Sequence, residues 1–115
     1  MTGLTTHILD LTAGAPAADV AVRLFARRDA GWVNTVALKT NSDGRAILLT
    51  GDQVRVGAYR LEFDIGPHFR ATGAASTEPG FLETVVIDFT VTDPGAHYHV
   101  PLLVSPFGYS TYRGS

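Results

Sequence analysis

The sequence contains no cysteine, so a disulfide framework, a thiolate metal site and a cysteine nucleophile are all excluded. It has no apolar run approaching the roughly eighteen residues that a membrane-spanning helix needs. Residues 1–11 lack the basic region and long apolar run of a signal peptide, so we expect a cytoplasmic protein. Nine basic and eleven acidic side chains give a net charge of -2, which gives no reason to expect nucleic acid or a membrane as a partner.

Several catalytic signatures are also missing. There is no Gly-x-Ser-x-Gly nucleophile motif, no phosphate-binding loop and no dinucleotide fingerprint. The aspartates do not form an obvious catalytic pair, because most fall at turns or strand ends, where capping and solvation explain them. They are Asp10, Asp19, Asp43, Asp52, Asp64 and Asp93.

What the sequence does contain is the composition of one globular domain, residues 1–115, with 45% hydrophobic and 17% charged residues. Short runs of alternating apolar and polar residues predict strands, and turn residues separate them. The predicted strands are 4–11, 19–28, 32–40, 46–50, 59–65, 81–92, 97–104 and 109–113. This regular spacing predicts an all-β sandwich. A helical turn or two fits around 68–71, and Pro101 is expected at a sheet edge or a bulge because it cannot donate to a ladder.

Four histidines are candidates for chemistry: His7, His68, His97 and His99. In an extended segment His97 and His99 share one face, and Thr5 lies on the same face as His7. Such histidines exchange protons with a reacting water near neutral pH, or they ligate zinc, with His7 as a third ligand. The alternative is that each is a hydrogen-bonded bystander, which is favoured most strongly for His68.

Two further features stand out. Arg45 directly follows the turn Asn41-Ser42-Asp43-Gly44, so backbone geometry fixes its position at a strand end, although a solvated turn residue is the simpler interpretation. The segment 97–115 concentrates tyrosine, proline, histidine and arginine, which are costly to order in a loose tail. We therefore expect this segment to form part of the functional site.

Three stretches carry a resemblance to a known family: THILD at 6–10, TNSDGR at 40–45 and HYHVPLLVSPFGYSTYRGS at 97–115. The chain resembles the 5-hydroxyisourate hydrolase branch of the transthyretin-like family, whose terminal YRGS distinguishes it from the hormone carriers. The resemblance implies a Greek-key sandwich of two four-stranded antiparallel sheets with one short helix. It also implies a homotetramer, a dimer of dimers, in which two strands of each subunit extend the sheets across the dimer. Active sites are expected between the dimers, where the C-termini approach.

The implied reaction is hydrolysis of the cyclic amide of 5-hydroxyisourate, an unstable product of urate oxidation, to 2-oxo-4-hydroxy-4-carboxy-5-ureidoimidazoline on the way to allantoin. Carried over by position, the catalytic residues are His7, Arg45, His99, Tyr112 and Ser115, of which His7, Arg45 and Tyr112 also bind substrate. His97 has a supporting role, and neither a metal nor another cofactor is implied.

These residue types suit the implied reaction. Histidines deprotonate the attacking water, and an arginine binds a planar heterocycle and stabilises an oxyanion. Two alternatives remain, a transthyretin-type carrier without catalysis and a zinc-dependent hydrolase.

Overall fold

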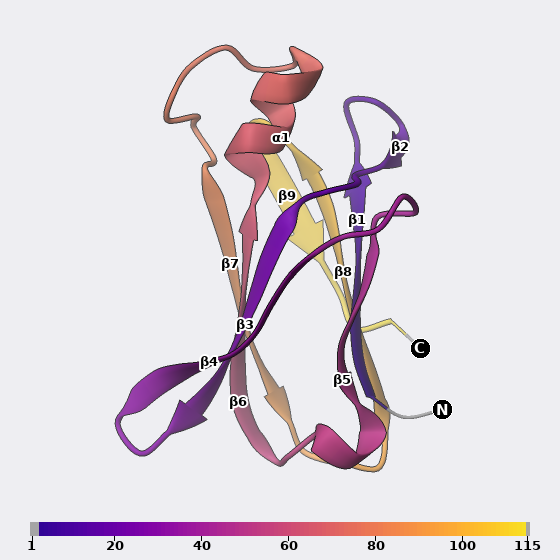
Figure 1. The fold of residues 1–115 in the computed structure, drawn as a ribbon, viewed down its shortest axis with the longest axis vertical. Coiled ribbons are helices and arrows are strands. Elements are labelled where there is room, and N and C mark those ends of the chain that lie inside the picture. Colours follow the sequence, from indigo (N-terminus) through magenta and orange to yellow (C-terminus); the bar gives the residue numbers. More distant parts are fainter. Residues whose placement is uncertain (1–2, 115) are drawn as a thin grey trace.

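The computed structural model describes residues 3–114, which form nine strands, one α-helix and one 3-10 helix (Figure 1). In chain order the elements are β1 (Gly3–Asp10), β2 (Ala15–Pro16), β3 (Ala21–Arg28), β4 (Gly31–Lys39), β5 (Arg45–Thr50), η1 (Gly51–Gln53), β6 (Gly57–Asp64), α1 (Ile65–Thr72), β7 (Thr84–Val91), β8 (His97–Ser105) and β9 (Gly108–Thr111).

The strands form two sheets that face each other (Figure 1). One has the order β4-β3-β6-β7, with every pair antiparallel. The other has the order β2-β1-β8-β9, and β5 pairs with the same edge of β1 as β2 does. The predicted all-β sandwich with one short helix is therefore confirmed. The sheet that contains β1 has a fifth strand, β2, of only two residues.

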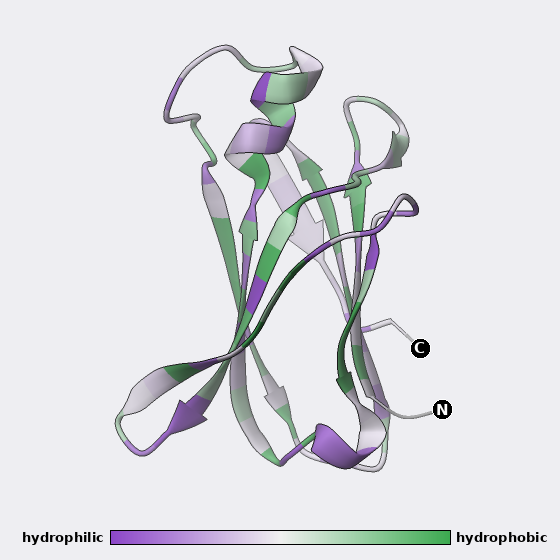
Figure 2. Ribbon diagram, viewed as in Figure 1, coloured by the Kyte–Doolittle hydropathy of each residue, from purple (hydrophilic) through white to green (hydrophobic). Residues whose placement is uncertain are grey.

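Alternation along the strands builds the core, as the sequence pattern predicts. In β3 the apolar residues Val22, Leu24 and Ala26 are buried, and the residues between them are partly exposed. β1 and β8 alternate in the same way, so the hydrophobic side chains of both sheets meet between them. Figure 2 shows the matching changes between hydrophobic and hydrophilic residues along the strands. The second face of the β1–β8 sheet carries the partly exposed side chains of Thr5, His7, His97 and His99, and the candidate site lies there.

The pairing of β1 with β8 departs from the all-antiparallel sheets that the resemblance implied, because these two strands run parallel. They come from opposite ends of the chain, and no hairpin joins them, so no turn imposes an antiparallel arrangement. The register places His99 opposite Thr5 and His97 opposite Gly3. Parallel pairing thus brings the N-terminal strand and the histidine-rich segment side by side.

The expectation that Pro101 lies at an edge or a bulge is wrong, since β8 is flanked by β1 and β9. The β8–β9 ladder stops at the pair Leu102–Thr111, and the next contact is the bridge between His99 and Gly114. Pro101 sits in this interruption, where its carbonyl oxygen accepts a hydrogen bond from Thr111 Oγ1 at 2.7 Å. Because N–H and C=O of one strand residue point to the same side, the missing donor of proline falls where the ladder is already open.

Helix α1 covers one end of the sandwich, and its eight residues make about two turns, as the sequence predicted (Figure 1). It buries Ile65 and Phe69, and it ends at Gly73, whose φ of +82° is a left-handed conformation that glycine adopts readily. His68 Nε2 lies 2.8 Å from Oδ2 of the buried Asp10, which joins the helix to β1. Both residues have a structural role here, which agrees with the bystander interpretation of His68.

Candidate active site

His7 and Arg45 lie directly opposite each other on β1 and β5. The turn before Arg45 fixes this position, because Asn41 Oδ1 accepts hydrogen bonds from the backbone N–H groups of Asp43 (2.9 Å) and Arg45 (3.0 Å). Gly44 has φ +72°, and a Cβ there would lie 2.6 Å from a backbone oxygen of β1. The turn can therefore pack against β1 only with glycine at this position.

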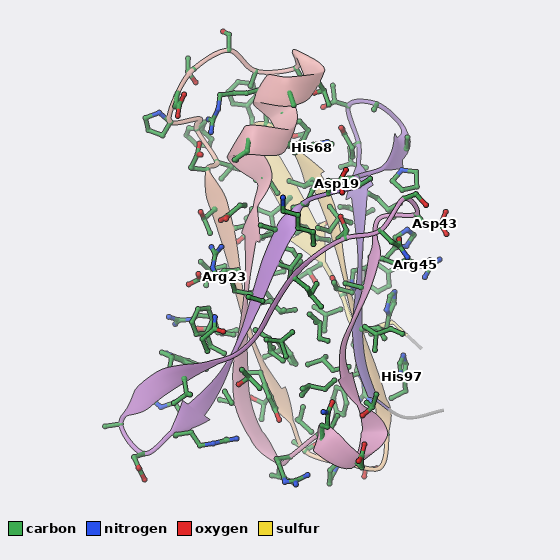
Figure 3. The ribbon with its side chains drawn as sticks, in the orientation of Figure 1. Asp19, Arg23, Asp43, Arg45, His68 and His97 are labelled. Carbon is green, nitrogen blue, oxygen red and sulfur yellow. The ribbon has the colours of Figure 1, made fainter. Side chains whose placement is uncertain are left out.

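His7 is oriented by the same turn. Its Nε2 donates to the backbone oxygen of Asp43 at 3.0 Å, because a carbonyl oxygen can only accept. Figure 3 shows Arg45 and Asp43 together on the outer side of this sheet, with His97 farther along the same side. The turn thus fixes the ring of His7 and the backbone from which the Arg45 side chain extends.

His97 and His99 stand on the same face of β8, as their spacing predicts, while Tyr98 is buried on the opposite face. The two rings are nearly parallel, with centroids 6.4 Å apart. Thr5 Oγ1 lies 2.8 Å from His99 Nδ1 and 3.2 Å from His97 Nε2. Three strands therefore bring Thr5, His7, Arg45 and both histidines of β8 to one face.

The electrostatics of this face keep His99 neutral. Burial lowers the pKa of His99 below its ordinary value, and repulsion from the charge of Arg45, and from His7 and His97 whenever they are protonated, lowers it further. A neutral imidazole at neutral pH can exchange a proton with a water or hold a hydrogen bond to a substrate.

The C-terminal residues pack against the histidine strand. Gly114 N donates to the backbone oxygen of His99 at 2.7 Å, and a Cβ on Gly114 would lie 2.6 Å from His99 Cδ2. The Arg113 guanidinium carbon lies 4.2 Å from the centre of the Tyr98 ring, and Nη2 is 3.4 Å from the backbone oxygen of His97. These contacts hold the segment against β8, as expected for a part of the site.

Tyr112 is not brought to the histidines within one chain. It is 58% exposed and lines a cavity of about 300 Å³ together with Tyr98, Val100 and Phe89, whereas the histidines lie on the other face of β8. Ser115 lies outside the described residues. The structure of one chain thus brings together three of the five predicted site residues, His7, Arg45 and His99.

Sequence reasoning gave no role to Thr5 or Gly114, although the alternation of β1 had placed Thr5 on the His7 face. Contact of both with His99 depends on the pairing of β8 with β1 and with the C-terminal segment, which the sequence pattern does not reveal.

Over residues 3–114, no group of three or more histidine, aspartate or glutamate side chains is placed to hold a metal ion.

Comparison with known proteins places this geometry in a family. The model of the HIUase/Transthyretin family matches residues 4–114. The chain belongs to that family. A 5-hydroxyisourate hydrolase of Caulobacter vibrioides is 58% identical over the full length of both proteins. The HIUase/Transthyretin membership confirms the resemblance seen in the sequence.

Solved structures of 31–37% sequence identity share the fold of this chain. The 5-hydroxyisourate hydrolase of Klebsiella pneumoniae has a TM-score of 0.81 and 34% identity over all of both chains. An (S)-allantoin synthase has a TM-score of 0.90 and 37% identity. The match covers 99% of the present chain and 44% of the synthase chain. The transthyretin of Sparus aurata has a TM-score of 0.87 and 31% identity, and the match covers 99% of the present chain and 97% of the transthyretin chain. The fold alone therefore does not separate enzymes from carriers.

Proposed function

We propose that this protein hydrolyses the cyclic amide of 5-hydroxyisourate to 2-oxo-4-hydroxy-4-carboxy-5-ureidoimidazoline. The observation that carries the proposal is the convergence of His7, Arg45 and His99 on one face, from three different strands. A carrier has no need of two histidines beside an arginine, whereas ring opening needs proton exchange and an oxyanion contact. The name of the Caulobacter vibrioides relative supports the same conclusion.

His7, His99 and Arg45 divide the reaction between them. A histidine takes a proton from water while the water oxygen bonds to the ring carbonyl carbon. The Arg45 guanidinium stabilises the charge that develops on the carbonyl oxygen. The carbon–nitrogen bond then breaks, its electron pair goes to nitrogen, and that nitrogen takes up the proton. The lowered pKa of His99 favours this exchange, because it keeps the ring uncharged before substrate binds.

We further propose that the site is completed in a homotetramer, with Tyr112 stacking on or bonding to the substrate and Ser115 supplying a hydroxyl and a carboxylate. Two features of the single chain support assembly. Ile47, opposite Thr5 in the ladder, is 67% exposed on the histidine face. β7 and β9 each end a sheet, and within residues 3–114 neither has a strand on its outer side. Pairing of these strands between copies would extend both sheets and remove the open edges.

No helix in the described part of the chain is long and apolar enough to cross a membrane. A cytoplasmic location stays a prediction.

The test is direct. We expect purified protein to accelerate the ultraviolet decay of 5-hydroxyisourate, generated freshly from urate by urate oxidase. Arg45→Ala should reduce the rate by about 10²–10³-fold because one oxyanion contact is lost, and we expect His99→Ala to abolish the acceleration. Each variant should keep the circular dichroism spectrum of the parent.

Decay at the spontaneous rate, together with tight binding of thyroxine, would favour the carrier alternative, for which a sea bream transthyretin complex with thyroxine is the structural parallel.

If the zinc alternative were correct, a chelator would remove the activity. We expect activity to survive chelation, with metal analysis as the accompanying measurement.

A further inference from the structure

A single hydroxyl group connects the two histidines of β8. Thr5 Oγ1 lies within hydrogen-bonding distance of His99 Nδ1 (2.8 Å) and of His97 Nε2 (3.2 Å). A hydroxyl has one hydrogen to donate and two lone pairs to accept with. The two ring nitrogens therefore cannot both be unprotonated and both be bonded to Thr5. If both nitrogens carried hydrogen, both could donate to Thr5, but the hydrogen of the Thr5 hydroxyl would then have no partner among the contacts of residues 3–114.

Two arrangements use every hydrogen-bonding group of this contact. In the first, His97 Nε2–H donates to Thr5, and the Thr5 hydroxyl donates to a bare His99 Nδ1. In the second, the directions are reversed, so Thr5 donates to His97 Nε2 and His99 Nδ1–H donates to Thr5. For neutral rings, the first arrangement puts the hydrogen of His99 on Nε2, and the second puts it on Nδ1.

The surroundings of His97 distinguish these arrangements. Within residues 3–114, His97 Nδ1 is buried and has no hydrogen-bond partner. In the first arrangement this atom is a bare acceptor, whereas in the second it carries a buried N–H without a partner. Orphaned buried donors are rarer in native proteins than under-satisfied acceptors, because an unpaired N–H loses its hydrogen bond to water without replacement. The first arrangement is therefore favoured.

We propose that Thr5 is a positioning residue that places the hydrogen of His99 on Nε2, so that His99 acts as a hydrogen-bond donor toward the substrate and His7 acts as the base. His7 complements this arrangement. Its Nε2 donates to the backbone oxygen of Asp43, so a neutral His7 presents a bare Nδ1 that can accept a proton. The assignment of roles rests on the proposed hydrolysis, but the tautomer of His99 does not.

In the resulting reaction, His7 Nδ1 takes a proton from water as the water oxygen bonds to the carbonyl carbon. His99 Nε2–H and Arg45 donate hydrogen bonds to the oxyanion. When the carbon–nitrogen bond breaks, its electron pair goes to the ring nitrogen, which receives the proton from His7. Both histidines end the cycle in their starting forms.

The test begins with the tautomers of the unaltered protein. With ¹⁵N-labelled histidine at pH 8, nuclear magnetic resonance should show both His97 and His99 protonated at Nε2 and bare at Nδ1. His7→Gln, His68→Gln and His97→Gln each remove one signal, so the signal of the fourth histidine, His99, is assigned by elimination. A His99 ring protonated at Nδ1 would overturn the proposal, whether or not the protein hydrolyses 5-hydroxyisourate. Failure of the proposed function is thus distinguishable from failure of this inference.

Thr5→Val keeps the β-branched shape and removes the hydroxyl. We expect a larger fraction of His99 with hydrogen on Nδ1 and a kcat lower by about ten- to a hundredfold, with little change in KM, as when a functional histidine loses its orienting partner. Thr5→Ser should restore kcat and the tautomer. The matched control is Thr6→Val on the other face of β1, which removes a hydroxyl bonded to the Val100 backbone oxygen. Unchanged kcat in Thr5→Val, or a Thr5→Ser variant that is folded but equally impaired, would contradict the positioning role.

Discussion

His99 is the residue on which the contacts of the site converge. Its Nδ1 meets Thr5 from β1, its backbone oxygen accepts from Gly114, and the Cα of Gly114 lies close to its ring. The ring is therefore held on one side by a strand and on the other by the C-terminal segment. Its lowered pKa follows from the same burial, because desolvation disfavours the charged imidazolium.

Gly114→Ala should disrupt the site without unfolding the protein. A Cβ at this position would lie 2.6 Å from His99 Cδ2 and 3.2 Å from His99 Cβ, so the ring or the segment must move. Since misplacement of a catalytic group by about 1 Å can cost about 10²-fold in rate, we expect a loss of that order in kcat/KM for 5-hydroxyisourate. Gly108→Ala is the matched control, because nothing lies within 4 Å of its added Cβ. Equal rates in the two variants would show that the close packing of Gly114 on His99 does not matter.

At the scale of elements, helix α1 and the loop that follows it are tied down by one carboxylate. Arg70 donates two hydrogen bonds to Glu83, at 2.9 and 2.8 Å, and Gly80 N adds a third at 2.8 Å. Glu83 also accepts from Gly66 N through its backbone oxygen at 3.0 Å. These contacts explain why β7 begins at Thr84, three residues later than the predicted start at 81.

Glu83 should make the stability of the protein dependent on acid. Its pKa is lowered to about 2 from an ordinary 4.5, first by the hydrogen bonds from Arg70 and then by that from Gly80. A carboxyl with a lowered folded-state pKa stabilises the fold above its unfolded pKa, and this stabilisation is lost as pH falls from about 4.5 to about 2. Glu83→Gln should therefore be less stable than the parent at pH 6, and the difference should shrink toward pH 2.5 in urea unfolding. Glu78→Gln in the same loop is the control, and a difference that stays constant with pH would refute this role.

At the scale of the whole molecule, the histidine face is open in one chain and Tyr112 lies on the other side of β8. A single subunit therefore brings the histidines and the arginine together, but it does not bring Tyr112 to them. Assembly of several copies accounts for this, since it lets the C-terminal segments of neighbouring chains approach one another's histidines. The exposed Phe81 and Phe107, whose ring centroids lie 6.0 Å apart with the planes tilted by 40°, add apolar surface beside β9.

Deletion of residues 112–115 should give a folded but inactive protein. The β8–β9 ladder ends at Thr111, so the strands remain, whereas the contacts of Arg113 with Tyr98 and of Gly114 with His99 are lost. Light scattering after size-exclusion chromatography should give four times the 12.3 kDa chain mass for the full-length protein. Near-full turnover by the shortened protein would exclude a role for its C-terminal segment in catalysis.

The sequence by itself determined the strands, their buried faces and the residue types of the site. The alternation of apolar and polar residues along a strand depends only on neighbouring residues, and so does the turn formed around Asn41 and Gly44. Both could therefore be predicted without knowledge of the tertiary structure. The start of β7 could not be predicted in this way, because Arg70 and Glu83 lie thirteen positions apart and only packing brings them together.

Only the tertiary structure decided which strands lie side by side. The parallel register of β1 with β8 places Thr5 between His97 and His99, and no local pattern encodes a contact between residues more than ninety positions apart. The same pairing corrected the expectation for Pro101, which occupies an inner strand at a gap in its ladder. Residue types are fixed along the chain, but the hydrogen bonds that set a histidine's tautomer form only where distant strands meet.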